Sequence, residues 1–115
     1  MNIESIKTLF TLFSGEDVSE KNMPLINLSV AEVEKMLLPE TNPADMRLDF
    51  LSASMANYKL QQINASRERY EYTVAGKMLK ESQNTSLKFA EKLLHDYMNI
   101  CSELISEKTF IFMGF

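Results

Sequence analysis

The side chains with the greatest potential for catalysis are a single histidine and a single cysteine. His95 and Cys101 lie six residues apart in a segment predicted to be helical, so they point in different directions and form no nucleophile–base pair. The acidic residue next to His95 is Asp96. One histidine and one cysteine also provide no metal-ligand spacing. We therefore predict neither catalytic nor metal-binding residues.

Paired acids and glycines offer no better site. Asp45 and Asp49 share a helix face, but Arg47 lies between them near a predicted helix start, which favours a solvated face over acid–base chemistry. The three glycines are too scattered to form a phosphate-binding loop: Gly15, Gly76 and Gly114. We expect no enzyme, no cofactor and no small-molecule substrate.

The composition indicates one mainly helical domain. The chain has 115 residues, of which 45% are hydrophobic and 24% charged, enough apolar material for one core. Three glycines and three prolines are few for a turn-rich β fold. The net charge of -4 argues against general attraction to nucleic acid or to an anionic membrane.

Localisation is predicted from what the sequence lacks. A single cysteine forms no intramolecular disulfide, and the first residues lack the pattern of a secretory signal, which favours a reducing cytoplasm. No apolar run approaches the roughly 18 to 20 residues that cross a bilayer. We expect a protein that does not span a membrane.

Two short helices are expected in residues 1–40. Apolar residues between Ile3 and Phe13 recur at helical spacing, and Gly15 suits a left-handed C-terminal cap. Residues 16–28 are predicted to be a loop. Ser29 and Glu32 match a capping box, so we expect the second helix to begin there and to end before Pro39.

Two longer helices are expected to pair with each other. The first starts at Asn42-Pro43-Ala44-Asp45, where Asn caps and Pro takes the first helical position, and runs to residue 65 or 66. Its apolar stripe is broad enough to predict burial against more than one neighbour. The second follows the possible caps Asn84-Thr85-Ser86, and its apolar side is broadened by Phe89, Leu93, Ile100 and Ile105.

A short β-hairpin is expected between these helices, at about residues 68–81. Tyr70, Tyr72 and Val74 alternate with polar residues, and Ala75-Gly76 offers a turn before Met78. A lone hairpin is marginal in water and needs support from the helices or from another subunit. The predicted fold is therefore about four helices with one hairpin, in a single domain of residues 1–115.

Basic residues gather around this hairpin and indicate an alternative function. Arg67, Arg69, Lys77 and Lys80 are interleaved with tyrosines, as at a nucleic-acid-binding edge. Several glutamates in the same stretch dilute the positive field, so a solvated surface is the competing interpretation. A small regulatory or nucleic-acid-binding helical domain that uses the basic region 67–92 is the alternative that these residues leave open.

The aromatic end of the sequence needs to be covered. The last residues, Thr109-Phe-Ile-Phe-Met-Gly-Phe115, are unusually apolar for a terminus. Phe110, Phe112 and Phe115 either fold back on their own core or dock on a neighbouring copy, and the sequence does not decide between the two.

Residues 43–115 resemble a family of small structural proteins of tailed phages and prophages. The resemblance is carried by the run from Asp45 to Leu60, by Tyr70-Glu-Tyr-Thr-Val-Ala-Gly, by Ser86-Leu-Lys-Phe-Ala-Glu-Lys-Leu-Leu and by Phe110-Ile-Phe. The pattern of long helix, Ala-Gly hairpin, long helix and aromatic tail is similar to that of head–tail connector, or neck adaptor, proteins.

The resemblance implies a function in particle assembly. Connector proteins are mostly helical, form rings between the portal and the tail, and carry no catalytic residues. It implies a homo-oligomer that contacts portal and tail components, made in the cytoplasm of a host bacterium and then part of the virion. The implied subunit contacts are Tyr70, Tyr72, Val74, Met78, Phe110, Phe112 and Phe115, and the basic positions would face a DNA channel.

Overall fold

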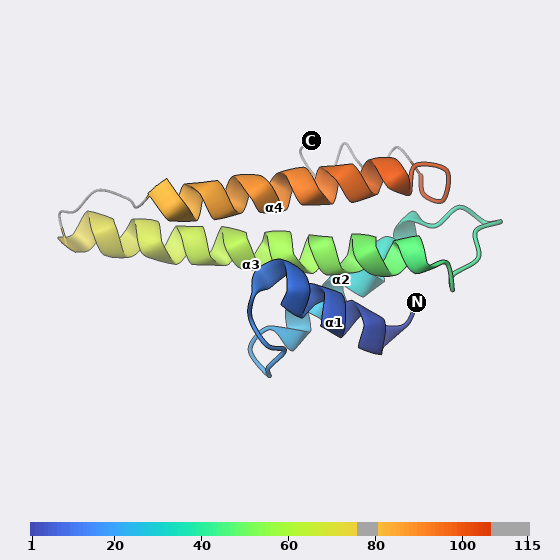
Figure 1. The fold of residues 1–115 in the computed structure, drawn as a ribbon, viewed down its shortest axis with the longest axis horizontal. Helices are drawn as coiled ribbons and strands as arrows, with labels where there is room; N and C mark the ends of the chain where they lie inside the picture. Colours follow the sequence, from blue (N-terminus) through green and yellow to red (C-terminus); the bar gives the residue numbers. More distant parts are fainter. Residues whose placement is uncertain (76–80, 107–115) are drawn as a thin grey trace.

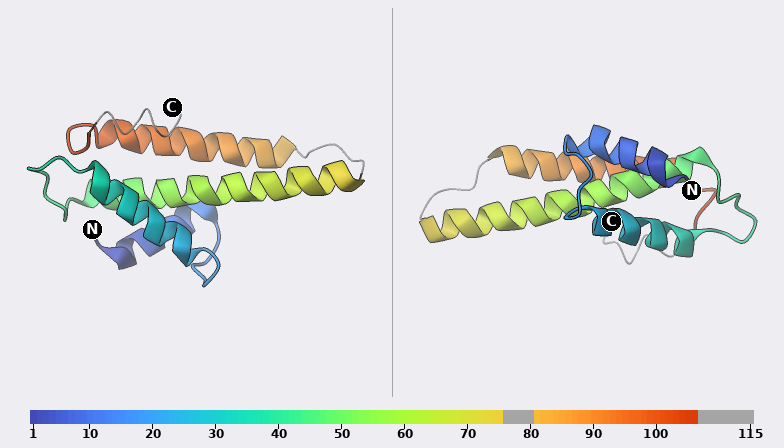
Figure 2. Two further views of the ribbon diagram at one scale, coloured as in Figure 1. Left: turned by 180° about the vertical axis from the view of Figure 1, so that it is seen from behind. Right: turned by 90° about the horizontal axis from the view of Figure 1, so that it is seen from below.

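A computed structural model describes the backbone of residues 1–75 and 81–106, and the side chains of residues 1–67 and 85–106. This part of the chain is mainly helical, with four helices and no strand. The long helix α3 (Met46–Ala75) lies in the centre and α4 (Glu81–Ile100) runs antiparallel along it. The shorter α1 (Ile3–Ser14) and α2 (Met23–Met36) cross the other side of α3, on opposite flanks (Figures 1 and 2).

Helix α1 has the ends that its sequence predicts. The Asn2 side chain accepts hydrogen bonds from the backbone N–H groups of Glu4 at 3.0 Å and Ser5 at 3.2 Å, which caps the first turn. Gly15 has a φ of 75°, and its N–H donates to the carbonyl of Thr11 at 2.9 Å. The left-handed glycine cap is thus confirmed.

Helix α2 begins six residues earlier than the capping box predicts. Pro24 occupies its first turn, where the missing N–H costs nothing. Ser29 lies inside the helix, and its hydroxyl donates to the carbonyl of Leu25 at 2.8 Å. The predicted cap at Ser29 and Glu32 is therefore wrong, because a serine in mid-helix satisfies its hydroxyl on the preceding turn.

The residue that caps α3 lies three positions after the predicted cap, Asn42. Asp45, and not Asn42, accepts the first-turn N–H, from Arg47 at 3.0 Å. Asn42 instead accepts from the N–H of Ala44 at 3.0 Å, within the preceding turn. Pro43 thus belongs to that turn and not to the helix.

The predicted hairpin at about residues 68–81 is wrong over the residues that the structure describes. Helix α3 continues through Ala75 and α4 begins at Glu81, so the alternating Tyr70, Tyr72 and Val74 have helical backbone. Tyr70 and Val74 are four residues apart, a spacing that suits a helix as well as a strand alternation does. Extending a helix that already exists costs no nucleation, whereas a hairpin would have to form anew. Residues 76–80, which include Gly76 of the predicted turn, lie outside the described residues.

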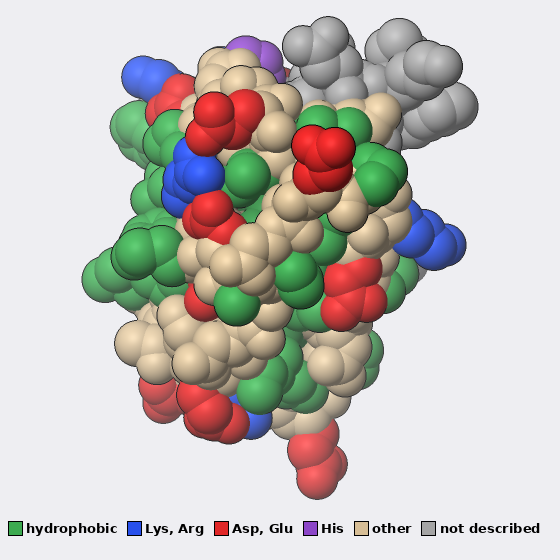
Figure 3. Space-filling view, turned by 90° about the vertical axis from the view of Figure 1, so that its right-hand side faces the viewer, with side chains coloured by type: hydrophobic (Ala, Val, Ile, Leu, Met, Phe, Trp, Pro, Cys, Tyr) green, Lys and Arg blue, Asp and Glu red, His purple; other side chains and the backbone are tan. Residues whose placement is uncertain are grey.

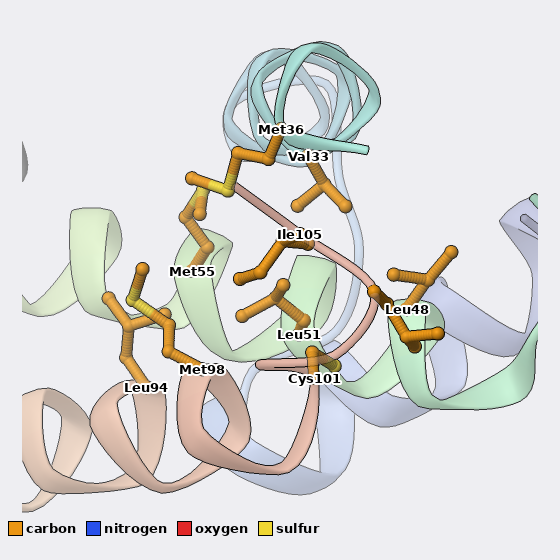
Figure 4. Packing of buried hydrophobic residues seen from close by; sticks show 10 residues of the cluster. Val33, Met36, Leu48, Leu51, Met55, Leu94, Met98, Cys101 and Ile105 are labelled. Atoms are coloured by element: carbon orange, nitrogen blue, oxygen red, sulfur yellow. The ribbon is translucent and has the colours of Figure 1, made fainter. Parts of the chain in front are cut away.

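The core has two parts, and α2 and α3 contribute to both. In the first, α1 and α2 pack on the small residues Ala53 and Ala56 of α3 through Ile6, Phe10 and Ile26. The second joins α2, α3, α4 and the segment after α4; Figure 4 shows it around Leu51 and Ile105. The predicted pairing of the two long helices and the burial of α3 against several neighbours are both confirmed.

The segment after α4 is tied to the end of α2. Leu37 and Ile105 form an isolated antiparallel bridge. The N–H of Leu38 donates to the carbonyl of Leu104 at 3.0 Å, and the N–H of Ser106 donates to the carbonyl of Met36 at 2.8 Å. The position at which the chain enters its aromatic tail is therefore fixed against α2.

Candidate functional site

A surface groove lies where the end of α1 meets α3 and α4, and we call it the α1–α3–α4 groove. Its volume is about 220 Å³. None of the residues that line it is charged: Phe13, Ser14, Asn57, Gln61, Ser86, Phe89, Ala90 and Leu93. Small-molecule sites usually measure about 300–1,000 Å³, so this groove is better suited to a few side chains of another polypeptide.

One of the lining residues, Phe13, belongs to an aromatic cluster. The ring of Phe13, at the end of α1, lies 6.4 Å from the ring of Phe50 and 5.8 Å from that of Tyr97, centre to centre. The rings of Phe50 and Tyr97 are 5.3 Å apart. Contacts of this length between tilted rings are favourable and connect the last turn of α1 to both long helices.

The groove is also lined by the most unusual side chain of α4. Phe89 is 68% exposed, whereas Ala90, its neighbour in the groove, is 3% exposed. Leaving a phenylalanine in water forgoes roughly 1.5–3 kcal/mol of burial free energy. A partner that covers Phe89 would recover much of this free energy.

The floor of the groove is an amide pair on α3. Asn57 is 4% exposed and Gln61 is 9% exposed, and Gln61 Nε2 donates to Asn57 Oδ1 at 3.1 Å. Among the described residues, no other side chain or backbone group pairs with Asn57 Nδ2 or Gln61 Oε1. A buried polar group left without a partner costs about 1–3 kcal/mol, so the floor favours a ligand with its own donor and acceptor.

A second hollow, of about 600 Å³, lies at the end of the molecule where the two loops after α2 and α4 meet. Figure 3 faces this end and shows acidic and hydrophobic side chains intermixed. Two of the three acidic side chains in its lining are paired: Arg47 contacts Asp45 at 2.8 Å and Glu103 at 2.5 Å. The hydroxyl of Thr41 donates to the carbonyl of Leu104 at 2.8 Å. We therefore interpret this hollow as part of the contact between the two loops and not as a binding site.

The Arg47 ion pair leads to a pH-dependent prediction. Hydrogen bonds from Arg47 lower the pKa of Asp45 from 3.8 to about 2. Because the folded pKa lies below the unfolded value, the stabilisation is complete above about pH 4 and is lost as the pH falls towards 2. Asp45→Asn keeps a capping residue but removes the charge. We expect it to lower the free energy of unfolding at pH 7, and the gap to the wild type to narrow between pH 4 and 2 in urea titrations.

Arg47→Met provides the control for this prediction. In that background, Asp45→Asn should have much less effect at pH 7, because the partner charge is already gone. An undiminished effect of Asp45→Asn on the Arg47→Met protein would contradict the assignment of the pKa shift to the ion pair.

The two residues with catalytic potential lie in different surroundings. Cys101 is fully buried, its thiol donates to the carbonyl of Arg47 at 3.4 Å, and burial raises the pKa of the thiol to about 11. His95 lies on the exposed side of α4, beside Asn99. In the described part of the chain, no group of three or more His, Cys, Asp or Glu residues is arranged to hold a metal ion.

Most of the residues predicted to form an interface lie beyond the described side chains. Tyr70, Tyr72 and Val74 have helical backbone only, and the remaining predicted contacts, Met78, Phe110, Phe112 and Phe115, lie outside the described residues. The same holds for Lys77 and Lys80, and for the side chain of Arg69.

The basic side chains that are described do not form a uniform patch. Arg67 is exposed and lines a surface hollow together with Lys21 and the acidic Glu16. On α4, Lys88 and Lys92 surround Glu91 at the surface. Acidic and basic groups alternate in both places, which weakens attraction to a phosphate backbone.

The sequence did not identify the groove, and it assigned Phe89 to the buried side of its helix. Phe89 and Ile100 are 68% and 50% exposed, while Ala90, Leu94 and Met98 form the buried stripe of α4. A signal was present: Ser86 and Lys92, three residues before and after Phe89, are both polar. Centring the stripe on Leu94 would have placed Phe89 about 140° away around the helix, on the exposed side.

Comparison with known proteins adds no relative. No protein-family model, no curated protein and no solved structure matches this chain. Among the helices described by the structure, none combines the length and the apolar character needed to span a membrane.

Proposed function

We propose that this chain is a non-enzymatic assembly subunit that self-associates and joins larger components by burying apolar surface. The proposal is supported chiefly by one observation, the exposure of Phe89 beside an uncharged groove with a buried amide floor. Single exposed hydrophobic residues are common on protein surfaces, but an aromatic beside a concave site is typical of a protein-binding anchor.

Rigidity of the surrounding helices favours this proposal. The groove is formed by three helices, and Phe13 is held in contact with Phe50 and Tyr97. A surface that is already ordered loses little conformational entropy when a partner binds. Burial of Phe89 therefore contributes to affinity with little opposing cost.

The finer proposal is a head–tail connector subunit of a tailed phage or prophage. It is supported by the resemblance of residues 43–115 and by the two long paired helices that the resemblance implies. Since α3 is helical through Ala75, the contact that we propose does not include a hairpin. Instead of the hairpin, we propose the α1–α3–α4 groove as a subunit contact.

The test is sedimentation of the full chain over a range of concentrations. The wild type is expected to self-associate, and Phe89→Glu is expected to weaken the association at least tenfold, because it places a charge in a contact that must be desolvated. Met46→Glu is the matched control. Met46 is 66% exposed and lies at the first position of α3, where an acid is tolerated.

Two outcomes would contradict the assembly function. A wild-type chain that remains monomeric at every concentration would contradict self-association. An equal loss of association in Phe89→Glu and Met46→Glu would show that added negative charge, and not the groove, is responsible.

A further inference from the structure

We propose that the α1–α3–α4 groove binds the aromatic tail, residues 109–115, of a second copy of this chain. This inference rests on the proposed function and names the occupant of its contact surface. It is carried by the free groups of the amide floor, by the apolar and uncharged walls, and by the position of Ser106, which precedes the tail.

The amide floor is suited to a peptide backbone. With Gln61 Nε2 bonded to Asn57 Oδ1, the groups without a partner among the described residues are the NH2 group of Asn57, the second N–H of Gln61 and the carbonyl of Gln61. Rotating both amides by 180° exchanges their roles and again leaves free N–H donors and one free carbonyl. A peptide unit presents one donor and one acceptor, so it can pair with the free carbonyl and with one free N–H of this floor whatever its side chains are.

The walls are suited to the side chains of the tail. After Lys108, the sequence Thr-Phe-Ile-Phe-Met-Gly-Phe contains no charged side chain, and neither does the lining of the groove. The volume of about 220 Å³ is sufficient for few large side chains at a time. Phe13 and Phe89 both line the groove, so their rings are available for aromatic contacts with an incoming phenylalanine.

Geometry favours the tail of a second copy over the tail of the same copy. Ser106 is hydrogen-bonded to Met36 at the end of α2, whereas the groove opens beside α1, and the two short helices lie on opposite flanks of α3 (Figure 2). Half the circumference of a helix of about 10 Å diameter is roughly 15 Å, or about five extended residues. If the tail of the same copy passed around α4 to reach the groove, this path would use about five of the nine residues 107–115. Only about four residues would then be left to bind in the groove.

The proposed contact is heterologous, because each copy contributes a groove at one site and a tail at another. Repetition of such a contact generates a closed ring or an open chain, and not an isolated two-fold dimer. The contact needs the groove of one copy and the tail of another. A copy with a defective groove can therefore still form one contact with a copy that has a defective tail.

Complementation between two full-length variants tests this inference. One variant carries Phe89→Glu in the groove, and the other carries Phe110→Glu and Phe112→Glu in the tail. Each variant alone is expected to associate at least tenfold more weakly than the wild type. An equimolar mixture should form a 1:1 heterodimer, since the intact tail of the first variant can bind the intact groove of the second. Sedimentation and native mass spectrometry would report the masses.

The possible failures separate this inference from the proposed function. If the wild type associates and Phe89→Glu weakens it, but the tail variant associates normally, the groove has another occupant and only the tail assignment is overturned. If both variants are weakened but their mixture forms no heterodimer, the tail does not bind this groove in trans. If the wild type is monomeric throughout, both proposals are overturned. Far-ultraviolet circular dichroism of each variant excludes loss of helix as the cause.

Discussion

Phe10→Ala is expected to lower the free energy of unfolding by about 3–5 kcal/mol, which is the usual cost of deleting a fully buried phenyl ring. Phe10 is 0% exposed and packs where α1 and α2 meet the alanines of α3. Helix α1 also supplies Phe13 to the groove, so its docking supports both the fold and the candidate site. Urea unfolding followed by circular dichroism gives the change in free energy.

Phe89→Ala is the matched control for this prediction, because it deletes the same ring from an exposed position. In dilute, monomeric protein it should change the free energy of unfolding by no more than about 0.5 kcal/mol. The protein must be dilute because self-association stabilises the folded state. If Phe89→Ala weakened association, that effect would be added to the measured change in the free energy of unfolding. Equal losses from Phe10→Ala and Phe89→Ala would contradict the burial that distinguishes the two rings.

Helix type and helix pairing could be predicted from the sequence because both depend on local periodicity. The apolar stripe of α4 and the broad apolar face of α3 could be predicted from the spacing of apolar residues along the chain alone. The glycine cap at Gly15 was equally local. Helix starts were less certain where several capping residues compete. Pro24 and Ser29 both suit a helix start, and the choice depends on how α2 packs on α3.

The hairpin and the groove show where local reasoning fails. Alternation over the five residues from Tyr70 to Val74 is too short to distinguish a strand from the last turns of a long helix. The groove depends on side chains from Phe13, Asn57 and Phe89, which only the packing of three helices brings together. A single sequence contains no period that connects such distant positions.

Ile105→Ala is expected to lower the free energy of unfolding by about 2–5 kcal/mol, although Ile105 lies outside every helix. Its side chain is 1% exposed and enters the core beside Leu51, as Figure 4 shows, while its backbone pairs with Leu37. The substitution therefore weakens the connection between α2 and the segment that leads into the tail.

Ile100→Ala separates burial from residue type, because Ile100 is the same residue five positions earlier and is 50% exposed. Its loss should stay within about 0.5 kcal/mol in urea unfolding. Similar losses from Ile100→Ala and Ile105→Ala would show that the segment after α4 is not anchored as described. In that case Ser106 would not be fixed against α2, and the geometric reason for assigning the tail to a neighbouring copy would disappear. The loss of unfolding free energy in Ile105→Ala is therefore also a test of the geometry behind the proposed assembly.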